Sequence, residues 1–240
     1  MCTFTFSVNA TAEVYRLAWT NTSPVPPVGA LASTNVSIDL NSDLGEGVGE
    51  DPQALDEALL SVVTSANVAC GGHAGDRESM MRVSELATAR RVAIGAHISY
   101  DDRDGFGRES NGVSMEILKE QLLEQIATLD EIAHAAGSAV TYVKAHGQLY
   151  HQACIPGSVE AQTIIDAVRE YQDQTDRQLA ILGFAGSDLV SRAQAEHIKA
   201  VNEAFADRSY TAEGWLVART EPGALITDPK PAVGKEPGAL

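Results

Sequence analysis

The pattern that decides the fold lies in the stretch Asn67-Val68-Ala69-Cys70-Gly71-Gly72-His73-Ala74-Gly75-Asp76. Residues 67–70 predict a short strand that ends at a glycine pair. Residues 77–91 follow with apolar side chains at helical spacing, and residues 92–96 form an apolar run of strand length. A strand, a helix and another strand in this order predict parallel strands joined by a crossover helix.

The same alternation extends on both sides of this unit. Further strands are expected at residues 36–40, 139–143, 180–183 and 198–205. Further helices are expected after Asp51-Pro52, over residues 114–137, around residues 164–168 and after Ser187-Asp188. Such strands predict a parallel sheet covered by helices. The pattern alone allows both an open doubly wound sheet and a closed β/α barrel.

Composition narrows the class of protein. The 240 residues suffice for one large domain or two small ones, and 44% of them are hydrophobic. The formal net charge of −16 argues against binding to nucleic acid or to an anionic membrane surface. Cys2, Cys70 and Cys154 form no C-x-x-C pair, and no apolar run reaches the length of a membrane span. A cytoplasmic protein with reduced thiols is therefore expected.

The chain divides into three segments by composition. Residues 1–35 are rich in Thr, Ser, Asn and Ala, include a proline-rich stretch, and lack the basic start and apolar middle of a secretory signal. We expect them to be a disordered N-terminal extension. Residues 36–228 carry the strand–helix alternation and form the barrel domain. Residues 229–240 are a Pro/Gly-rich tail.

Polar residues follow the predicted strands one after another. The carboxyl ends of parallel strands lie on one face of the fold, so these side chains are expected to share a pocket. A single histidine beside a glycine more often stabilises a loop, but three such histidines after successive strands favour a functional site. The candidates are Asn41, Asp43, Glu46, His73, Asp76, His97, Arg103, Lys144, His146 and Arg208.

Five ordered motifs resemble those of the LamB/YcsF family: residues 41–47, 66–76, 95–97 with 102–103 and 106–108, 143–150, and 203–208. The resemblance covers residues 36–228. It implies a TIM-like β/α barrel of the glycoside hydrolase/deacetylase superfamily type. This family continues beyond Ile226 to a further strand, whereas here a Pro/Gly-rich tail follows. The barrel is therefore expected to be C-terminally shortened, with an open edge.

The resemblance also implies an activity, which is ATP-dependent opening of 5-oxo-L-proline to L-glutamate by the A-type component of a 5-oxoprolinase, together with B- and C-type partner subunits. ATP is the expected cosubstrate, although the sequence contains no G-x-x-x-x-G-K-[ST] loop. The substrate is a small lactam, and the chain is a candidate homo-oligomer.

Opening a lactam needs a base, a positive group near the developing oxyanion, and a partner for the substrate carboxylate. Asp43 or Glu46 is the expected base, and His73 and His97 are acid/base or oxyanion partners. Lys144 and His146 form an electrostatic clamp. Arg103 or Arg208 is expected to hold the carboxylate, and Asn41 and Asp76 complete the substrate-binding set.

Two alternatives remain open at this stage. Asp43, His73, His97 and His146 are acceptable ligands for a divalent metal ion, so a metal-dependent deacetylase or amidohydrolase is a second interpretation. A third is a catalytically incomplete paralogue that only binds partner subunits.

Overall fold

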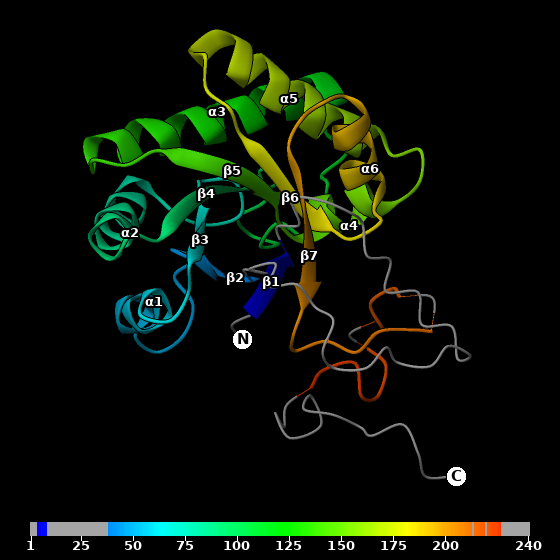
Figure 1. Ribbon diagram of the computed structural model, residues 1–240, viewed down its shortest axis with the longest axis horizontal. Helices are drawn as coiled ribbons and strands as arrows, with labels where there is room; N and C mark the ends of the chain where they lie inside the picture. The colour runs from blue at the N-terminus through cyan, green and yellow to red at the C-terminus, as the bar shows by residue number, and fades with distance from the viewer. Residues whose placement is uncertain (1–3, 9–37, 213, 219, 227–240) are drawn as a thin grey trace, which may run out of the picture.

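The structure, a computed structural model, describes residues 4–8, 38–212, 214–218 and 220–226 and forms a closed barrel (Figure 1). Strands β2 to β7 run parallel in sequence order, and β1 lies antiparallel between β7 and β2. The predicted β/α barrel is therefore confirmed. The strands are β1 Phe4–Val8, β2 Ile38–Leu44, β3 Ser65–Ala69, β4 Ala93–Ile98, β5 Val140–Ala145, β6 Ala180–Phe184 and β7 Ala200–Phe205.

Helices lie around the outside of the sheet (Figure 1). Five of the six described helices match helices expected from the sequence; α4, which begins directly after His146, was not expected. No described helix combines the length and apolar character needed to span a bilayer. The helices are α1 Pro52–Leu60, α2 Arg77–Arg90, α3 Met115–Ala135, α4 Gly147–Cys154, α5 Val159–Thr175 and α6 Asp188–Ala195.

Strand β1 differs from two expectations. Residues 4–8 fall in the segment expected to be a disordered extension, yet they form a strand whose residue Thr5 pairs with Asn41 of β2 and Phe205 of β7. The expected open edge is therefore wrong for the described residues, because β1 occupies the gap between β2 and β7. Residues 9–35 and the tail at 229–240 lie outside the described residues, so those parts of the domain division stay predictions.

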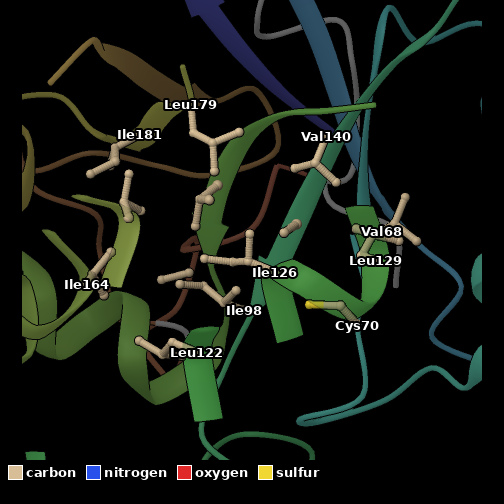
Figure 2. Close-up of a cluster of buried hydrophobic side chains, with 14 of the residues drawn as sticks. Val68, Cys70, Ile98, Leu122, Ile126, Leu129, Val140, Ile164, Leu179 and Ile181 are labelled. Atoms are coloured by element: carbon tan, nitrogen blue, oxygen red, sulfur yellow. The ribbon is translucent and has the colours of Figure 1, made fainter. Parts of the chain in front are cut away.

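The hydrophobic core fills the space between the sheet and its helices. Leu122, Ile126 and Leu129 recur along one face of α3 and are completely buried, as is Ile98 of β4 (Figure 2). Burying an aliphatic side chain of this size contributes about 1.5–3 kcal/mol relative to exposure. The three- and four-residue spacing of these apolar positions thus fixes α3 against the strands that carry the site.

Local backbone chemistry shapes the loop between β3 and α2. Asp76 begins α2 with a capping box, in which its side chain accepts from the Ser79 amide and the Ser79 hydroxyl accepts from the Asp76 amide. Gly75 has φ +82°, and a Cβ there would lie 2.3 Å from the Ala69 carbonyl oxygen. Only glycine permits this return of the loop onto the end of β3.

Candidate active site

Four polar side chains meet where strands β2 to β5 end. Glu46 follows β2, His73 follows β3, His97 lies near the end of β4, and His146 follows β5. One nitrogen or oxygen atom from each of these residues lies within 4.8 Å of the others. The sequence predicted that these residues would share one face of the fold, and the barrel brings them together.

The three imidazole rings have fixed mutual orientations. His73 and His146 stack face to face, with ring centroids 3.7 Å apart and planes inclined by 4°. His97 meets both rings edge-on, at 5.3 Å from His73 and 4.8 Å from His146. Phe106 packs edge-on against the same stacked pair. The rings are thus held in these orientations by packing against one another and against Phe106.

The outward-facing nitrogen of each ring also has a hydrogen-bond partner. His97 Nδ1 lies 3.2 Å from the Lys144 carbonyl oxygen, and His146 Nε2 lies 3.1 Å from the Phe106 carbonyl oxygen. His73 Nδ1 lies 3.1 Å from Ser99 Oγ. These contacts orient the opposite nitrogens, which are His73 Nε2, His97 Nε2 and His146 Nδ1, toward Glu46 Oε1.

The loop between β4 and α3 closes over the stacked rings. The Asp102 carboxylate accepts hydrogen bonds from the amides of Gly105 and Glu109 and so stabilises the turn. Gly107 has φ +69°, and a Cβ there would lie 2.9 Å from both His73 Cβ and His146 Cδ2. The absence of a side chain at Gly107 therefore allows the loop to reach the imidazoles.

Burial controls the protonation of the stacked pair. Burial and the neighbouring His97 lower the pKa of His73 to about 3. Burial, with His97 and His73 nearby, lowers the pKa of His146 to about 3 as well. Burial alone would also lower the pKa of His97, but the Asp43 carboxylate beside it raises that pKa above its ordinary value. His73 and His146 are accordingly neutral at physiological pH.

A second polar group lies inside the barrel beside the histidines. Lys144 Nζ lies 2.7 Å from Glu203 Oε1 and 3.4 Å from Asp43 Oδ1. The Tyr150 hydroxyl donates to Glu203 Oε2 at 3.0 Å. Lys144 and Glu203 are almost completely buried, with side-chain exposures of 4% and 0%. Such a buried charge pair needs these several partners to offset its desolvation.

Neighbouring charges determine the ionisation of Asp43 and Lys144 inside the barrel. Burial would raise the pKa of Asp43, but His97 and Lys144 hold it well below the usual range of a carboxyl group. Burial would lower the pKa of Lys144, but Asp43 and Glu203 raise it above its ordinary value. Burial and the nearby Asp43 raise the pKa of Glu46. Asp43 is thus the firmly ionised carboxylate of the site, and Glu46 is the more basic one.

Two site residues were missed from the sequence. Asn67 of β3 donates to Asn41 Oδ1 at 2.8 Å and to Asp43 Oδ1 at 2.9 Å, and accepts from the Tyr142 hydroxyl at 2.7 Å. Glu203 lies in β7. Residues two apart in a strand point to the same side of the sheet, so Glu203 shares a face with Val201 and Phe205. An acidic residue on that otherwise apolar face was the signal that could have revealed it.

Two cavities adjoin the histidine cluster. One, of about 420 Å³, is lined by Glu46, His73, Arg103 and Phe106 among others. The other, of about 540 Å³, is lined by Asp43, His97, Lys144, Arg108 and Arg208 among others. Their volumes lie within the usual range for small-molecule sites. Imidazoles of one cluster therefore face two separate spaces.

The remaining expected residues lie in different settings. Asn41 is buried beside Lys144, with its Oδ1 3.4 Å from Nζ. Arg208 lines the larger cavity and donates to the Val217 carbonyl oxygen. Arg103 donates to the carbonyl oxygens of Gly71 and Gly75, at the smaller cavity.

Asp76 lines the smaller cavity but is an exposed helix cap. Asp76 and Arg103 are therefore separated from the larger cavity that contains Lys144 and Arg208.

The two described cysteines do not supply a nucleophile. Burial raises the pKa of Cys154 to about 12 and raises that of Cys70 further above the ordinary thiol value. Because the thiolate is the reactive form, these groups are inert at neutral pH. The chemistry of the site rests on its carboxylates, imidazoles and lysine.

Comparison with known proteins places this geometry in a family. The chain is 50% identical to the 5-oxoprolinase A-subunit of Streptomyces avermitilis over 196 residues, which are 82% of this chain and 76% of that protein. It is 45% identical to the 5-oxoprolinase A-subunit 3 of Pseudomonas syringae pv. tomato, over 81% of this chain and 74% of that protein.

A solved structure has the same fold. The lactam utilization protein from Thermus thermophilus superposes with a TM-score of 0.73 and 36% sequence identity, over 81% of this chain and 76% of that one. The model of the LamB/YcsF family matches residues 38–236, a range that includes all the barrel strands from β2 to β7 and both polar groups of the site. The chain belongs to the LamB/YcsF family.

Proposed function

We propose that this chain is a hydrolase component that opens 5-oxo-L-proline, or a closely related lactam, to L-glutamate with ATP. The observation that carries the proposal is its 50% identity to a 5-oxoprolinase A-subunit over 82% of its length. The name of that relative, which designates one component of several, supports partner subunits of B and C type for this chain. The described thiols are free, which agrees with the reducing cytoplasm expected for such an enzyme.

The larger cavity is the proposed lactam site. Asp43, Lys144 and His146 line it, and Arg108 lines it from the loop after β4. Arg103 is engaged with two backbone carbonyls at the other cavity, so Arg108, with Arg208, replaces it as the proposed partner of the substrate carboxylate. A planar guanidinium holds a carboxylate through two parallel hydrogen bonds.

The proposed chemistry begins with an unreactive amide. Transfer of the terminal phosphoryl group of ATP to the lactam oxygen releases ADP and activates the ring carbon. One water adds to that carbon, and the carbon–nitrogen bond breaks with a proton passing to the nitrogen, which leaves an acyl phosphate. A second water hydrolyses the acyl phosphate to the free carboxylate and inorganic phosphate. Lys144, held as a cation between Asp43 and Glu203, is placed to stabilise negative charge on the oxygen. Asp43, the carboxylate that lines the larger cavity, is the proposed base for water.

ATP is proposed to bind with help from the partner subunits. The chain has no Walker-type phosphate loop. Its net charge of −16 also disfavours a polyanion on most of its surface. The larger cavity, with Lys144, Arg108 and Arg208, is the part of this chain proposed to receive the phosphoryl group.

The test is glutamate release from 5-oxoproline by this chain mixed with B- and C-type subunits from a relative. Release that requires ATP and all three proteins is expected. The change Lys144→Met is expected to lower kcat by about 100- to 1000-fold, the usual cost of losing an oxyanion donor. The control Lys119→Met, which breaks a partly exposed ion pair between α3 and α5, is expected to leave kcat unchanged. No release, beside an active A-type component of a relative, would exclude the proposal.

A second candidate is a metal-dependent amidohydrolase or deacetylase. The specific observation in its favour is the convergence of Glu46, His73, His97 and His146. Such an enzyme activates water directly and needs no phosphoryl donor. Hydrolysis of lactams or N-acetyl compounds by this chain alone, without ATP, would favour it over the first proposal.

A further inference from the structure

The hydrogen-bond partners of the three imidazoles determine which of their nitrogens carry protons. A carbonyl oxygen can only accept, so His97 Nδ1 must donate to Lys144 O, and His146 Nε2 must donate to Phe106 O. In the neutral rings, His97 Nε2 and His146 Nδ1 then both carry lone pairs. These two atoms lie 3.1 Å apart.

The same reasoning applies to His73. The Ser99 hydroxyl donates its one proton to the Tyr100 carbonyl oxygen at 2.9 Å. Its lone pair is left to accept from His73 Nδ1, which lies 3.1 Å away. His73 Nε2 therefore also carries a lone pair, and it lies 3.1 Å from Glu46 Oε1. Two contacts in the cluster thus join acceptor to acceptor.

Acceptors this close repel each other unless a positive charge lies between them. Without a metal, two extra protons would be needed: one on His97 Nε2, where the Asp43 carboxylate at 3.3 Å favours it, and one between His73 Nε2 and Glu46 Oε1. A single metal ion can satisfy all four atoms at once. We propose that Glu46 Oε1, His73 Nε2, His97 Nε2 and His146 Nδ1 bind one divalent transition-metal ion of the zinc type.

The distances fit a four-coordinate ion. Zinc bonds to nitrogen and carboxylate oxygen of about 2.0–2.1 Å keep tetrahedral ligand atoms about 3.3–3.4 Å apart. From Glu46 Oε1 the distances are 3.1 Å to His73, 3.6 Å to His146 and 4.0 Å to His97, and the His97–His146 contact is 3.1 Å. These four distances bracket the tetrahedral edge, and all the ligand atoms lie within 4.8 Å of one another, so side-chain shifts can close the site around one ion.

The ligand types select the ion. Three imidazoles and one carboxylate suit zinc, cobalt or nickel, whereas magnesium and calcium take oxygen ligands. The carbonyl and hydroxyl partners behind each ring are the outer contacts that metal-binding histidines have in general.

The second carboxylate near the rings, Asp43, is not assigned as a ligand. Its Oδ1 lies 3.3 Å from His97 Nε2, but the same oxygen already accepts from Asn67 and contacts Lys144. These partners place Asp43 beside the ion and not on it.

The site proposal does not rest on the lactam reaction, because it follows from the ligand geometry alone. The test uses the full chain, dialysed against a chelator and titrated with Co²⁺. One equivalent of Co²⁺ is expected to bind with the intense visible absorption of a four-coordinate site. Elemental analysis after loading with Zn²⁺ is expected to give one ion per chain.

Matched carboxylate variants separate ligand from neighbour. Glu46→Gln preserves side-chain size and is expected to weaken Co²⁺ binding by at least about 10- to 100-fold and to change the spectrum. Asp43→Asn is expected to keep one equivalent and the four-coordinate spectrum. His146→Ala is expected to lose the site, and the exposed His134→Ala, on α3, to keep it.

Three outcomes would overturn the proposal: no binding by folded wild-type chain, an octahedral cobalt spectrum, or equal binding by wild type and Glu46→Gln. Circular dichroism of each variant shows whether the chain is folded. If His146→Ala does not fold, the variants Glu46→Gln and Asp43→Asn, which preserve side-chain size, still decide the test. Absence of Co²⁺ binding by a wild-type chain that still releases glutamate with ATP would reject the metal site and leave the proposed function standing.

Discussion

Lys144 Nζ lies 2.7 Å from Glu203 Oε1 inside the barrel, where neither side chain has more than 4% of its surface exposed. The pair links two strands that β6 separates, because Lys144 is the penultimate residue of β5 and Glu203 lies in β7. The Tyr150 hydroxyl of α4 completes the contact by donating to the second Glu203 oxygen. Strand β7 therefore contributes one of the two carboxylates, beside Asp43, that keep Lys144 ionised within the barrel.

Replacing Glu203 with Gln should destabilise the fold strongly, because it leaves Lys144 with only the more distant Asp43 carboxylate. Removing one partner of a buried pair costs about 3–5 kcal/mol, and the remaining Asp43 contact places this variant near 3 kcal/mol. Urea denaturation would measure the loss. The control Glu131→Gln breaks an exposed pair with Arg77 and should cost less than about 1 kcal/mol. Equal losses in the two variants would contradict the prediction.

A side chain at Gly107 should displace the loop from the imidazole stack. Gly107→Ala places a Cβ 2.9 Å from atoms of His73 and His146, and alanine also resists φ +69°. We expect a stability loss of about 1–3 kcal/mol and loss of activity. Gly112→Ala is the matched control in the same loop, with φ +64° and no heavy atom within 4 Å of the added Cβ. This variant should lose only the part of the free energy of unfolding that the unfavourable backbone angle costs, and it should retain activity.

Changing Arg108 should affect substrate binding more than chemistry. Arg108 is exposed toward the larger cavity, and its guanidinium carbon lies 5.7 Å from the Phe106 ring centroid. If it holds the lactam carboxylate, Arg108→Ala should raise KM by about 10-fold or more, with a smaller change in kcat. Steady-state kinetics of the reconstituted enzyme would measure both constants. Glu109→Ala, the neighbouring exposed residue, should leave both constants near wild type; an unchanged KM in Arg108→Ala would assign the carboxylate elsewhere.

Local sequence patterns predicted most of the barrel and its central cluster. The spacing of apolar residues along α3 and the caps at Asp51 and Ser187 determine those helices locally, so they were predictable. His73, His97 and His146 were expected together because each falls at the carboxyl end of a strand.

Other features depend on contacts distant in sequence. Strand β1 is held by pairing with β2 and β7, across more than two dozen intervening residues. Its residues Phe4–Val8 do alternate apolar and polar side chains, which is a strand pattern, but the Thr/Ser-rich composition of residues 1–35 led to the prediction of disorder. The role of Arg103 is decided by the carbonyl oxygens of Gly71 and Gly75, whose direction depends on backbone angles that the sequence does not display. The short helix α4 likewise depends on tertiary packing, since isolated helices of its length are marginal in water.

Strand β1 provides the last prediction, because it alone closes the ring between β2 and β7 in the described structure. Thr5 pairs with Asn41 on one side and with Phe205 on the other. Proline at this position removes the backbone N–H of a residue that is paired on both sides and should detach the strand. We expect Thr5→Pro to lower the melting temperature and to promote self-association, since β2 and β7 would then present unpaired edges.

Thermal unfolding and static light scattering would test this expectation in the full chain. Ser7→Ala keeps the backbone donors of β1 and is the matched control, for which both measurements should equal wild type. If Thr5→Pro behaved like Ser7→Ala, closure by β1 would add nothing to stability, and the six parallel strands would suffice for the barrel.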